Sequence, residues 1–189
     1  MSESEREVVL VVDDESAITE AYADFLEPEY AVRTAYNGED ALAKLDATVD
    51  VVLLDRRMPG LVGDDVLESI REGGADVRVA MVTAVDAGFD IVDMEFDDYV
   101  VKPVTEAQLR ETVDGLLRCA AYERRLREFY RVSRTHAALS SAKDRTELAD
   151  SDEFQRLETR RTELRESLSA AAENLADEDF DALFRDLDV

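Results

Sequence analysis

Five side chains that could do chemistry stand at the ends of apolar, strand-like runs. Asp13 and Asp14 follow the run VVLVV, Asp55 follows VVLL, Thr83 follows VAMV, and Lys102 follows YVV. Carboxylates gathered at one point offer the oxygen ligands that a hard divalent cation such as Mg²⁺ prefers. The set therefore indicates cation-dependent chemistry, provided that the fold brings these residues together.

Each of these residues also has an ordinary structural reading. Either aspartate of the first pair could cap a helix that begins near Ser16. Thr83 could be a plain strand residue, and the Met-Pro-Gly run after Asp55 could be a turn. These readings account for the residues singly, but not for the order in which all five follow successive strands. We therefore expect the five side chains to converge on one edge of a sheet.

The elements that must position these side chains alternate between strands and helices. Five segments read as strands: VVLVVDD, YAVRTAY, VDVVLLD, VRVAMVT and DDYVVKP. Apolar residues with helical spacing lie between them around Tyr22, Ala41 and Ile70, more weakly from Phe89 to Phe96, and again around Val113. This alternation predicts an α/β fold with a five-stranded parallel sheet covered by helices on both faces, whose functional crevice lies at the carboxyl ends of the strands.

Composition narrows the class of protein. Of the 189 residues, 46% are hydrophobic, which is enough to build a core. The longest apolar run, Val8 to Val12, is too short to span a bilayer or to act as a secretory signal, so we expect a cytoplasmic protein without a membrane segment. The single cysteine, Cys119, excludes an internal disulfide framework, and the single histidine, His136, excludes most histidine-based metal sites.

The charge of the chain is extreme. The formal net charge is -24, and only three of the 22 basic residues are lysines. Acid-rich, lysine-poor surfaces resemble those of cytosolic proteins from salt-loving archaea, in which salt screens the repulsion between carboxylates. An acidic protein from an ordinary organism is the alternative. Either way, the balance argues against a general affinity for nucleic acid, whose phosphates such a surface repels.

Charge and composition change near residue 118. Residues 1–118 hold 29 acidic and 10 basic residues, whereas residues 119–189 hold 17 and 12. All seven glycines and all three prolines lie before the change. We therefore expect a disordered tail at residues 1–7, an α/β domain at residues 8–118 and a wholly helical domain at residues 119–189.

Residues 8–118 resemble the receiver domain of a two-component response regulator. The resemblance is carried by VVDDE at 11–15, LLDRRMPG at 53–60, VTA at 82–84 and DDYVVKP at 97–103. It implies a flavodoxin-like sheet with strand order 2-1-3-4-5.

The resemblance also implies a phosphoryl transfer. Asp55 would be the nucleophile and phosphoacceptor, and a sensor histidine kinase or a phosphotransfer protein would be the donor. Mg²⁺ would offset the charge that this transfer brings together. Asp14 and Asp55 would bind the cation directly and Asp13 through water, and the backbone carbonyl of Arg57 would complete the protein's ligands.

Three further roles follow from the resemblance. Lys102 would place its ammonium on a phosphoryl oxygen, and Thr83 would donate its hydroxyl to another. Tyr99 matches the family's switch aromatic, which rotates when the threonine moves toward the phosphate; it could also be a plain edge-strand aromatic. The pair Arg56 and Arg57 departs from the acidity of the domain, and could either guide a kinase's carboxylates or hold the loop by salt bridges.

The segment after residue 118 has a helical pattern throughout. A long helix continues from the receiver, with Cys119, Tyr122, Leu126 and Phe129 on one apolar side, and the run DRTEL signals a turn. A second helix repeats residues at three- and four-residue steps: Phe154, Leu157, Arg161, Leu164, Leu168, Ala171 and Leu175. This spacing predicts a coiled-coil seam, and we expect the two helices to form a hairpin or coiled coil.

Two details of this helical region are testable. Arg161 interrupts the seam, so we expect it to pair with Glu128 or Glu123 or to reach solvent. A short final helix should carry Phe180 and Phe184 on one face. The region also resembles the HalX domain that follows receivers in salt-loving archaea, mainly through the run YERRLREFYRVSRTHAAL.

Several outputs fit such a chain. We favour a helical module that binds a downstream protein or forms a homodimer, because no recognition-helix pattern with a glycine-containing turn is visible. The alternative is a transcriptional regulator that binds DNA through the helical domain. A metal-dependent phosphohydrolase is less favoured, because no further general acid or base is evident. We expect no enzymatic activity beyond slow self-dephosphorylation.

Overall fold

The computed structural model describes residues 6–174. The chain divides into two compact units, Met1–Leu117 and Arg118–Val189, and each is described by itself. Most of the predicted disordered tail and the predicted final helix lie outside the described residues. The predicted boundary after residue 118 stays a prediction. Among residues 6–174, the helices are too short or too polar for any of them to cross a membrane.

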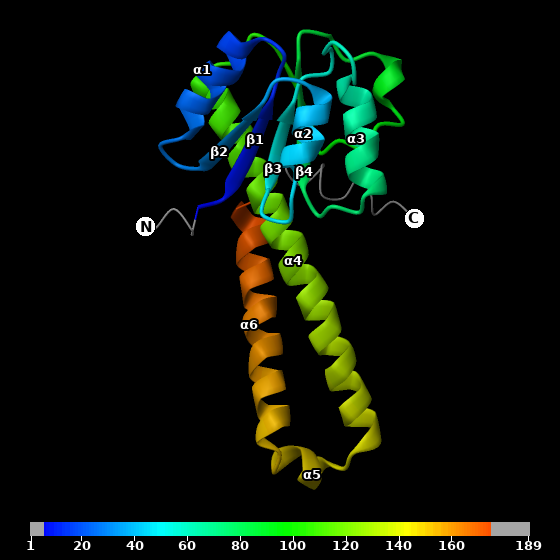
Figure 1. Cartoon of the computed structure of the whole chain (residues 1–189). Helices are drawn as coiled ribbons and strands as arrows, with labels where there is room; N and C mark the ends of the chain where they lie inside the picture. Colours follow the sequence, from blue (N-terminus) through cyan, green and yellow to red (C-terminus); the bar gives the residue numbers. More distant parts are fainter. Residues whose placement is uncertain (1–5, 175–189) are drawn as a thin grey trace. The chain divides into compact units, whose positions relative to one another are not determined.

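A five-stranded parallel sheet forms the centre of the first unit (Figure 1). Its strands are β1 (Val8–Val12), β2 (Ala31–Ala35), β3 (Val51–Leu54), β4 (Arg78–Thr83) and β5 (Asp98–Val101). Their order is β2-β1-β3-β4-β5, and every neighbouring pair is parallel. The predicted fold class and strand order are therefore confirmed.

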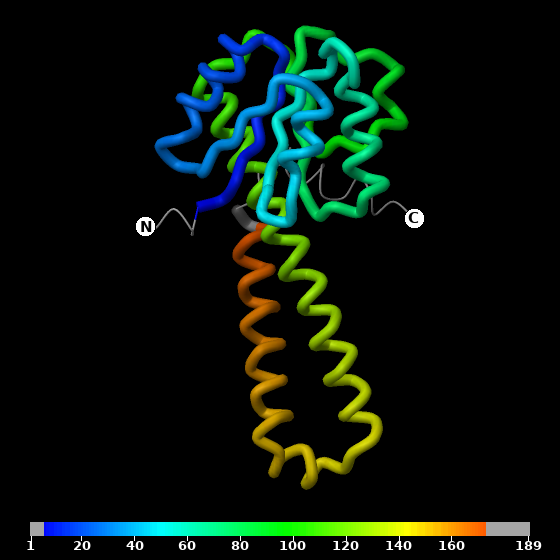
Figure 2. Tube along the Cα trace, in the orientation of Figure 1, coloured from blue at the N-terminus to red at the C-terminus, as the bar shows by residue number. Residues whose placement is uncertain are grey.

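Two apolar layers bury this sheet, because successive side chains of a strand point to opposite faces. Leu10 and Val12 of β1 join one cluster with residues of α2 (Gly38–Lys44) and α3 (Gly63–Glu72). Val9 and Val11 join the other, with residues of α1 (Ser16–Leu26) and the first turns of α4 (Glu106–Ala142). Figure 2 shows these helices on the two sides of the sheet. The strands are buried on both faces, so only their ends can present polar groups to solvent.

One predicted helix is wrong. The segment Phe89 to Phe96 forms only a short 3₁₀ helix, η2 (Phe89–Ile91). The Phe89 side chain is 98% exposed and Val92 is 72% exposed, whereas Met94 and Phe96 pack partly against the core. Burial is therefore limited mainly to the end of the segment, and a full helix would gain too little from it to offset its nucleation cost. The connection between β4 and β5 therefore consists mostly of turn and irregular structure.

The second unit is a helical hairpin. The part of α4 beyond Leu117 is followed by α5 (Arg145–Ala149) and by α6 (Asp152–Asn174), which runs back beside it (Figures 1 and 2). Asp144 begins α5 by accepting hydrogen bonds from two backbone amides. Among the described residues of this unit, five apolar side chains are buried: Cys119, Val132, Phe154, Leu164 and Leu168. The predicted helical fold of this region is confirmed as far as residue 174.

Polar pairs across the hairpin differ from the prediction. Glu128 accepts two hydrogen bonds of 2.9 Å from Arg160, not from Arg161. Arg161 Nη1 instead lies 2.8 Å from His136 Nδ1, and the His136 ring stacks on Phe154 with a centroid separation of 5.0 Å. Adjacent helical residues point about 100° apart, so only one of the two arginines can face Glu128. The expectation that Arg161 pairs with Glu128 is therefore wrong, whereas the expectations that it pairs with Glu123 or reaches solvent stay predictions.

Candidate functional site

Two buried carboxylates meet at the carboxyl edge of the sheet. In the sheet register, Val12 of β1 pairs with Leu54 of β3, so the residues that follow leave adjacent strands together. These residues are Asp13, which is 3% exposed, and Asp55, which is 6% exposed. An ionised carboxylate is costly to bury without a partner, so the pair requires a nearby cation or proton.

Lys102 supplies that partner from the end of β5. Its ammonium donates to Asp13 Oδ2 at 2.5 Å and to Asp55 Oδ1 at 3.0 Å. Burial opposes the charge of this lysine, but its hydrogen bonds to Asp13 and Asp55 outweigh burial and raise the pKa of Lys102. Burial also raises the pKa of Asp55, and the contact with Lys102 counters it only in part. One ammonium is thus shared by two carboxylates and offsets only part of their combined charge.

Backbone amides fix the remaining carboxylate oxygens. Arg57 N donates to Asp55 Oδ2 at 3.0 Å, and Glu15 N donates to Asp13 Oδ1 at 2.9 Å. The third predicted carboxylate, Asp14, is exposed. Within residues 6–174, no group of three or more His, Cys, Asp or Glu side chains is placed to hold a metal ion. The structure therefore brings together two of the three predicted acidic ligands. The predicted metal-binding atoms are all oxygens, which suit a hard cation.

Thr83 and Tyr99 lie on the next two strands. Thr83 ends β4 and is 1% exposed, and its Oγ1 accepts a hydrogen bond of 3.4 Å from Val85 N. The Tyr99 hydroxyl, on β5, donates to Val85 O at 2.8 Å. Lys102 N donates to Thr83 O at 2.8 Å, and the Lys102–Pro103 peptide bond is cis. Val85 therefore contacts both residues of the predicted switch.

The two arginines after Asp55 differ in their surroundings. The Arg56 side chain is only 11% exposed and forms ion pairs with Asp64 and Asp90. Arg57 is exposed. Of the two readings of this pair, the structure supports loop-holding salt bridges for Arg56.

Gly63 sets how closely α3 approaches the loop after Asp55. A Cβ atom on this glycine would lie 2.2 Å from Asp55 O and 2.8 Å from Arg56 Cα. Both are backbone atoms that cannot move aside easily. The glycine therefore allows a close approach that no larger residue permits.

Tyr22 is a residue near the site that the sequence pattern identified only as core. It lies on the inner face of α1 and is 7% exposed. Burial raises the pKa of its phenol, the charge of Lys102 lowers it, and the charges of Asp13 and Asp55 raise it. Helical periodicity could place Tyr22 on the inner face, but only the packing of α1 on the sheet brings it near these charges.

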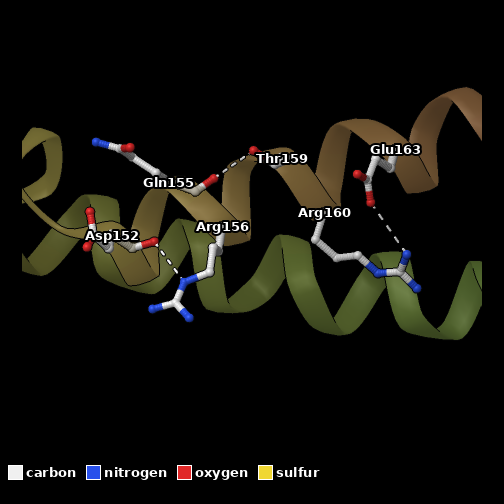
Figure 3. A pocket seen from close by; sticks show the side chains of 6 residues that line it. All are labelled: Asp152, Gln155, Arg156, Thr159, Arg160 and Glu163. Atoms are coloured by element: carbon white, nitrogen blue, oxygen red, sulfur yellow. Dashed lines mark hydrogen bonds and ion pairs between the residues drawn. The ribbon is translucent and has the colours of Figure 1, made fainter.

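A hollow on the helical unit is a second candidate site. Its volume is about 750 Å³, and six residues of α6 line it: Asp152, Gln155, Arg156, Thr159, Arg160 and Glu163 (Figure 3). Some of their polar groups form hydrogen bonds within α6: Arg156 Nε donates to Asp152 O, and Thr159 Oγ1 donates to Gln155 O. The hollow holds no pair of groups poised for acid–base chemistry, so the sheet edge is the stronger candidate.

Two family models match the chain. Residues 9–114 match the response regulator receiver domain, and residues 118–184 match the HalX domain. Together these matches cover the sheet edge and the hairpin described above.

Individual relatives agree with these matches. A protein of Haloferax volcanii named as a candidate transcriptional regulator is 50% identical over 169 residues, which make up 89% of this chain and 29% of that protein. The transcriptional regulatory protein ResD of Bacillus subtilis is 37% identical over 125 residues, or 64% of this chain and 52% of ResD. The chain thus spans about half or less of these curated relatives. Among solved structures, the response regulator TrrA of Thermotoga maritima, in complex with Mg²⁺ and BeF, has 36% identity and a TM-score of 0.51, and the match covers 59% of this chain and 99% of TrrA.

Proposed function

The chain belongs to the response regulator receiver family, with a HalX domain after the receiver, and we propose that Asp55 accepts a phosphoryl group from a histidine kinase or phosphotransfer protein. The observation that carries the proposal is the buried Asp55 carboxylate, held at the sheet edge by Lys102 and by Arg57 N. An Asp55 oxygen attacks phosphorus, the bond from phosphorus to the donor breaks, and an acyl phosphate forms. The proposal includes a cytoplasmic location, as the family resemblance implies.

Each residue at the sheet edge has a separate role in this phosphoryl transfer. The Lys102 ammonium moves to an oxygen of the incoming phosphoryl group and offsets part of its charge. Asp13, Asp14, Asp55 and the Arg57 carbonyl would hold Mg²⁺, whose oxygen preference fits this donor set. The cation supplies the remaining positive charge when bound. Burial excludes water from Asp55, which strengthens each of these electrostatic contacts.

The response to phosphorylation begins at Thr83. Its hydroxyl lies at the end of β4 and can turn toward a phosphoryl group on Asp55. That motion would weaken the contact with Val85 N, and Val85 in turn accepts from the Tyr99 hydroxyl. We infer that Tyr99 changes position when Thr83 does.

Phosphoryl labelling tests the proposal. With acetyl phosphate and Mg²⁺, mass spectrometry should find one acyl phosphate, on Asp55. Asp55→Asn should abolish the label, and Asp14→Asn should raise the Mg²⁺ concentration needed for half-maximal labelling. Asp65→Asn, at an exposed position of α3, is the matched control and should label as the wild type does. A label on another residue, with Asp55 unmodified, would refute the assignment.

For the output, we propose that the hairpin is a protein-interaction module that binds a downstream protein or a second copy of the chain. Its support is the antiparallel pair formed by α6 and α4 beyond Leu117, fixed by Arg160 on Glu128 and by His136 on Phe154. We assign the chain no enzymatic activity beyond slow loss of its own phosphoryl group.

DNA binding is the second candidate output. Among the exposed arginines of α4 are five beyond residue 120 that could contact phosphates: Arg124, Arg125, Arg127, Arg131 and Arg134. Light scattering and a DNA titration in molar KCl should separate the two outputs, because salt weakens phosphate contacts steeply. Sequence-selective binding that is lost in the double variant Arg124→Glu with Arg131→Glu, but kept in Arg156→Glu on α6, would favour DNA. Phosphorylation-dependent dimerisation without DNA binding would favour the interaction module.

A further inference from the structure

Arg56 occupies an unusual place beside the proposed phosphoacceptor. It directly follows Asp55, yet its side chain turns away from solvent and is only 11% exposed. A guanidinium so placed needs several acceptors, because it carries five N–H donors and a permanent charge. Its partners therefore reveal which segments it joins.

Two carboxylates from different segments bind this guanidinium. Asp64, in the first turn of α3, accepts from Arg56 Nε at 2.9 Å and from Nη2 at 3.1 Å, which is a bidentate arrangement. Asp90, in η2, accepts from Nη2 at 2.5 Å. Gly88 leaves room for this contact, because a Cβ atom there would lie 2.5 Å from Asp90 Oδ1. Arg56 thus links the loop after β3 to α3 and to the connection between β4 and β5.

The connection that Arg56 holds through Asp90 also contacts the predicted switch residues. Val85, in the same connection, accepts a hydrogen bond from the Tyr99 hydroxyl at 2.8 Å, and Val85 N donates to Thr83 Oγ1 at 3.4 Å. Hydrogen bonds to Asp64 and Asp90 raise the pKa of Arg56, so its charge stays in place. The segment tied to the guanidinium is therefore the one that bonds both Tyr99 and the threonine at the sheet edge.

We propose that Arg56 is a positioning residue that fixes the β4–β5 connection, and through Val85 the Tyr99 hydroxyl, relative to the loop after β3 (the acceptor loop) before phosphorylation. Arg56 bears on signalling only if Asp55 is the phosphoacceptor, so the inference rests on the proposed function. Around Asp90 the connection buries little apolar surface, since Phe89 and Val92 are exposed, whereas Met94 and Phe96 farther along pack partly against the core. The ion pair with Asp90 is therefore a main constraint on the part of the connection around η2. Loss of the guanidinium should free both the segment and the tyrosine.

Fluorine NMR of the full chain labelled with fluorotyrosine tests this role. The chain has six tyrosines, and Tyr99→Phe identifies the Tyr99 resonance by its loss. Arg56→Met should shift or broaden that resonance in the unphosphorylated protein. Arg56→Lys should fail to restore it, because an ammonium cannot form the bidentate contact with Asp64 while also reaching Asp90. Asp90→Ala removes the ion pair between Arg56 and Asp90, and because the Asp90 side chain is 60% exposed the change carries little risk to folding. It should shift the Tyr99 resonance in the same direction as Arg56→Met does.

Arg33→Met is the matched control. Arg33 also pairs with a carboxylate, but it lies on β2, and its partners Asp46, Thr48 and Lys44 O lie outside the acceptor loop. Its removal should leave the Tyr99 resonance at the wild-type position. A Tyr99 resonance unchanged in Arg56→Met and in Asp90→Ala, with both variants folded by circular dichroism, would overturn the proposal.

The two proposals fail in different ways. The Tyr99 resonance of the unphosphorylated protein reports on Arg56 without any phosphoryl donor. Acetyl phosphate labelling of the wild type reports on Asp55 without any change at Arg56. If labelling misses Asp55 but Arg56→Met still shifts the resonance, the phosphoacceptor assignment fails and the positional role stands. If labelling is normal but the resonance does not move, only the role of Arg56 fails.

Discussion

Replacing Lys102 by methionine should strongly destabilise the receiver unit. The ammonium is the shared partner of two carboxylates that are 3% and 6% exposed, and the lysine side chain is itself only 13% exposed. Methionine keeps most of the length and apolar surface, so the change removes mainly the charge. Removing one partner of a buried ion pair costs about 3–5 kcal/mol, because the other charge stays buried and unpaired. Here two like charges remain, so the free energy of unfolding should fall by about that amount.

Thermal unfolding in molar KCl without divalent cations measures this loss. For a chain of this size, each kcal/mol shifts Tm by about 2–4 °C, so a decrease of roughly 6–20 °C is expected. Lys44→Met is the matched control, because Lys44 pairs with Asp40 at a position where its side chain is 41% exposed. Exposed pairs contribute about 0–1 kcal/mol. The Lys102 effect should persist in high salt, since buried pairs are screened little.

The loss of stability in Lys102→Met should depend on pH. Without the ammonium, the pKa of Asp55 should rise further above its usual value, because the Lys102 hydrogen bond lowers it. A carboxyl group with a raised folded-state pKa binds its proton more tightly when folded, so stability increases as the pH falls through that pKa. The gap between Lys102→Met and the wild type should therefore narrow from pH 7 toward about pH 5. A Tm within about 2 °C of the wild type at neutral pH would refute the reasoning.

Two further outcomes are expected. Gly63→Ala should destabilise the receiver by about 1–3 kcal/mol in denaturant unfolding, because the new Cβ meets Asp55 O at 2.2 Å; Gly74→Ala has open space around it, and its cost should come only from the positive φ of 67°. Stability of the whole chain should rise from dilute buffer toward molar KCl, since salt screens the repulsion within a net charge of -24. A Tm that stays flat or falls over that range would count against a halophilic adaptation.

The sequence alone determined the sheet and the residues at its edge. Apolar runs that end in Asp13, Asp55, Thr83 and Lys102 predict buried parallel strands, and in parallel strands the carboxyl ends meet at one edge. The strand order came from the family resemblance, since periodicity cannot say which strands are neighbours. The helix prediction failed at Phe89 to Phe96, where the weak helical pattern is only partly buried and both Phe89 and Val92 are exposed.

Tertiary structure decided the partners of the charged side chains. The sequence could not choose between two roles for Arg56, because its partners Asp64 and Asp90 lie 8 and 34 residues away. It also left Arg161 a choice among Glu128, Glu123 and solvent, and helix rotation brings Arg160, not Arg161, to Glu128. Periodicity specifies which face of an element is buried, and so predicts the core. Long, flexible charged side chains take whichever partner the packed elements bring within reach, and that depends on distances that only the folded chain sets.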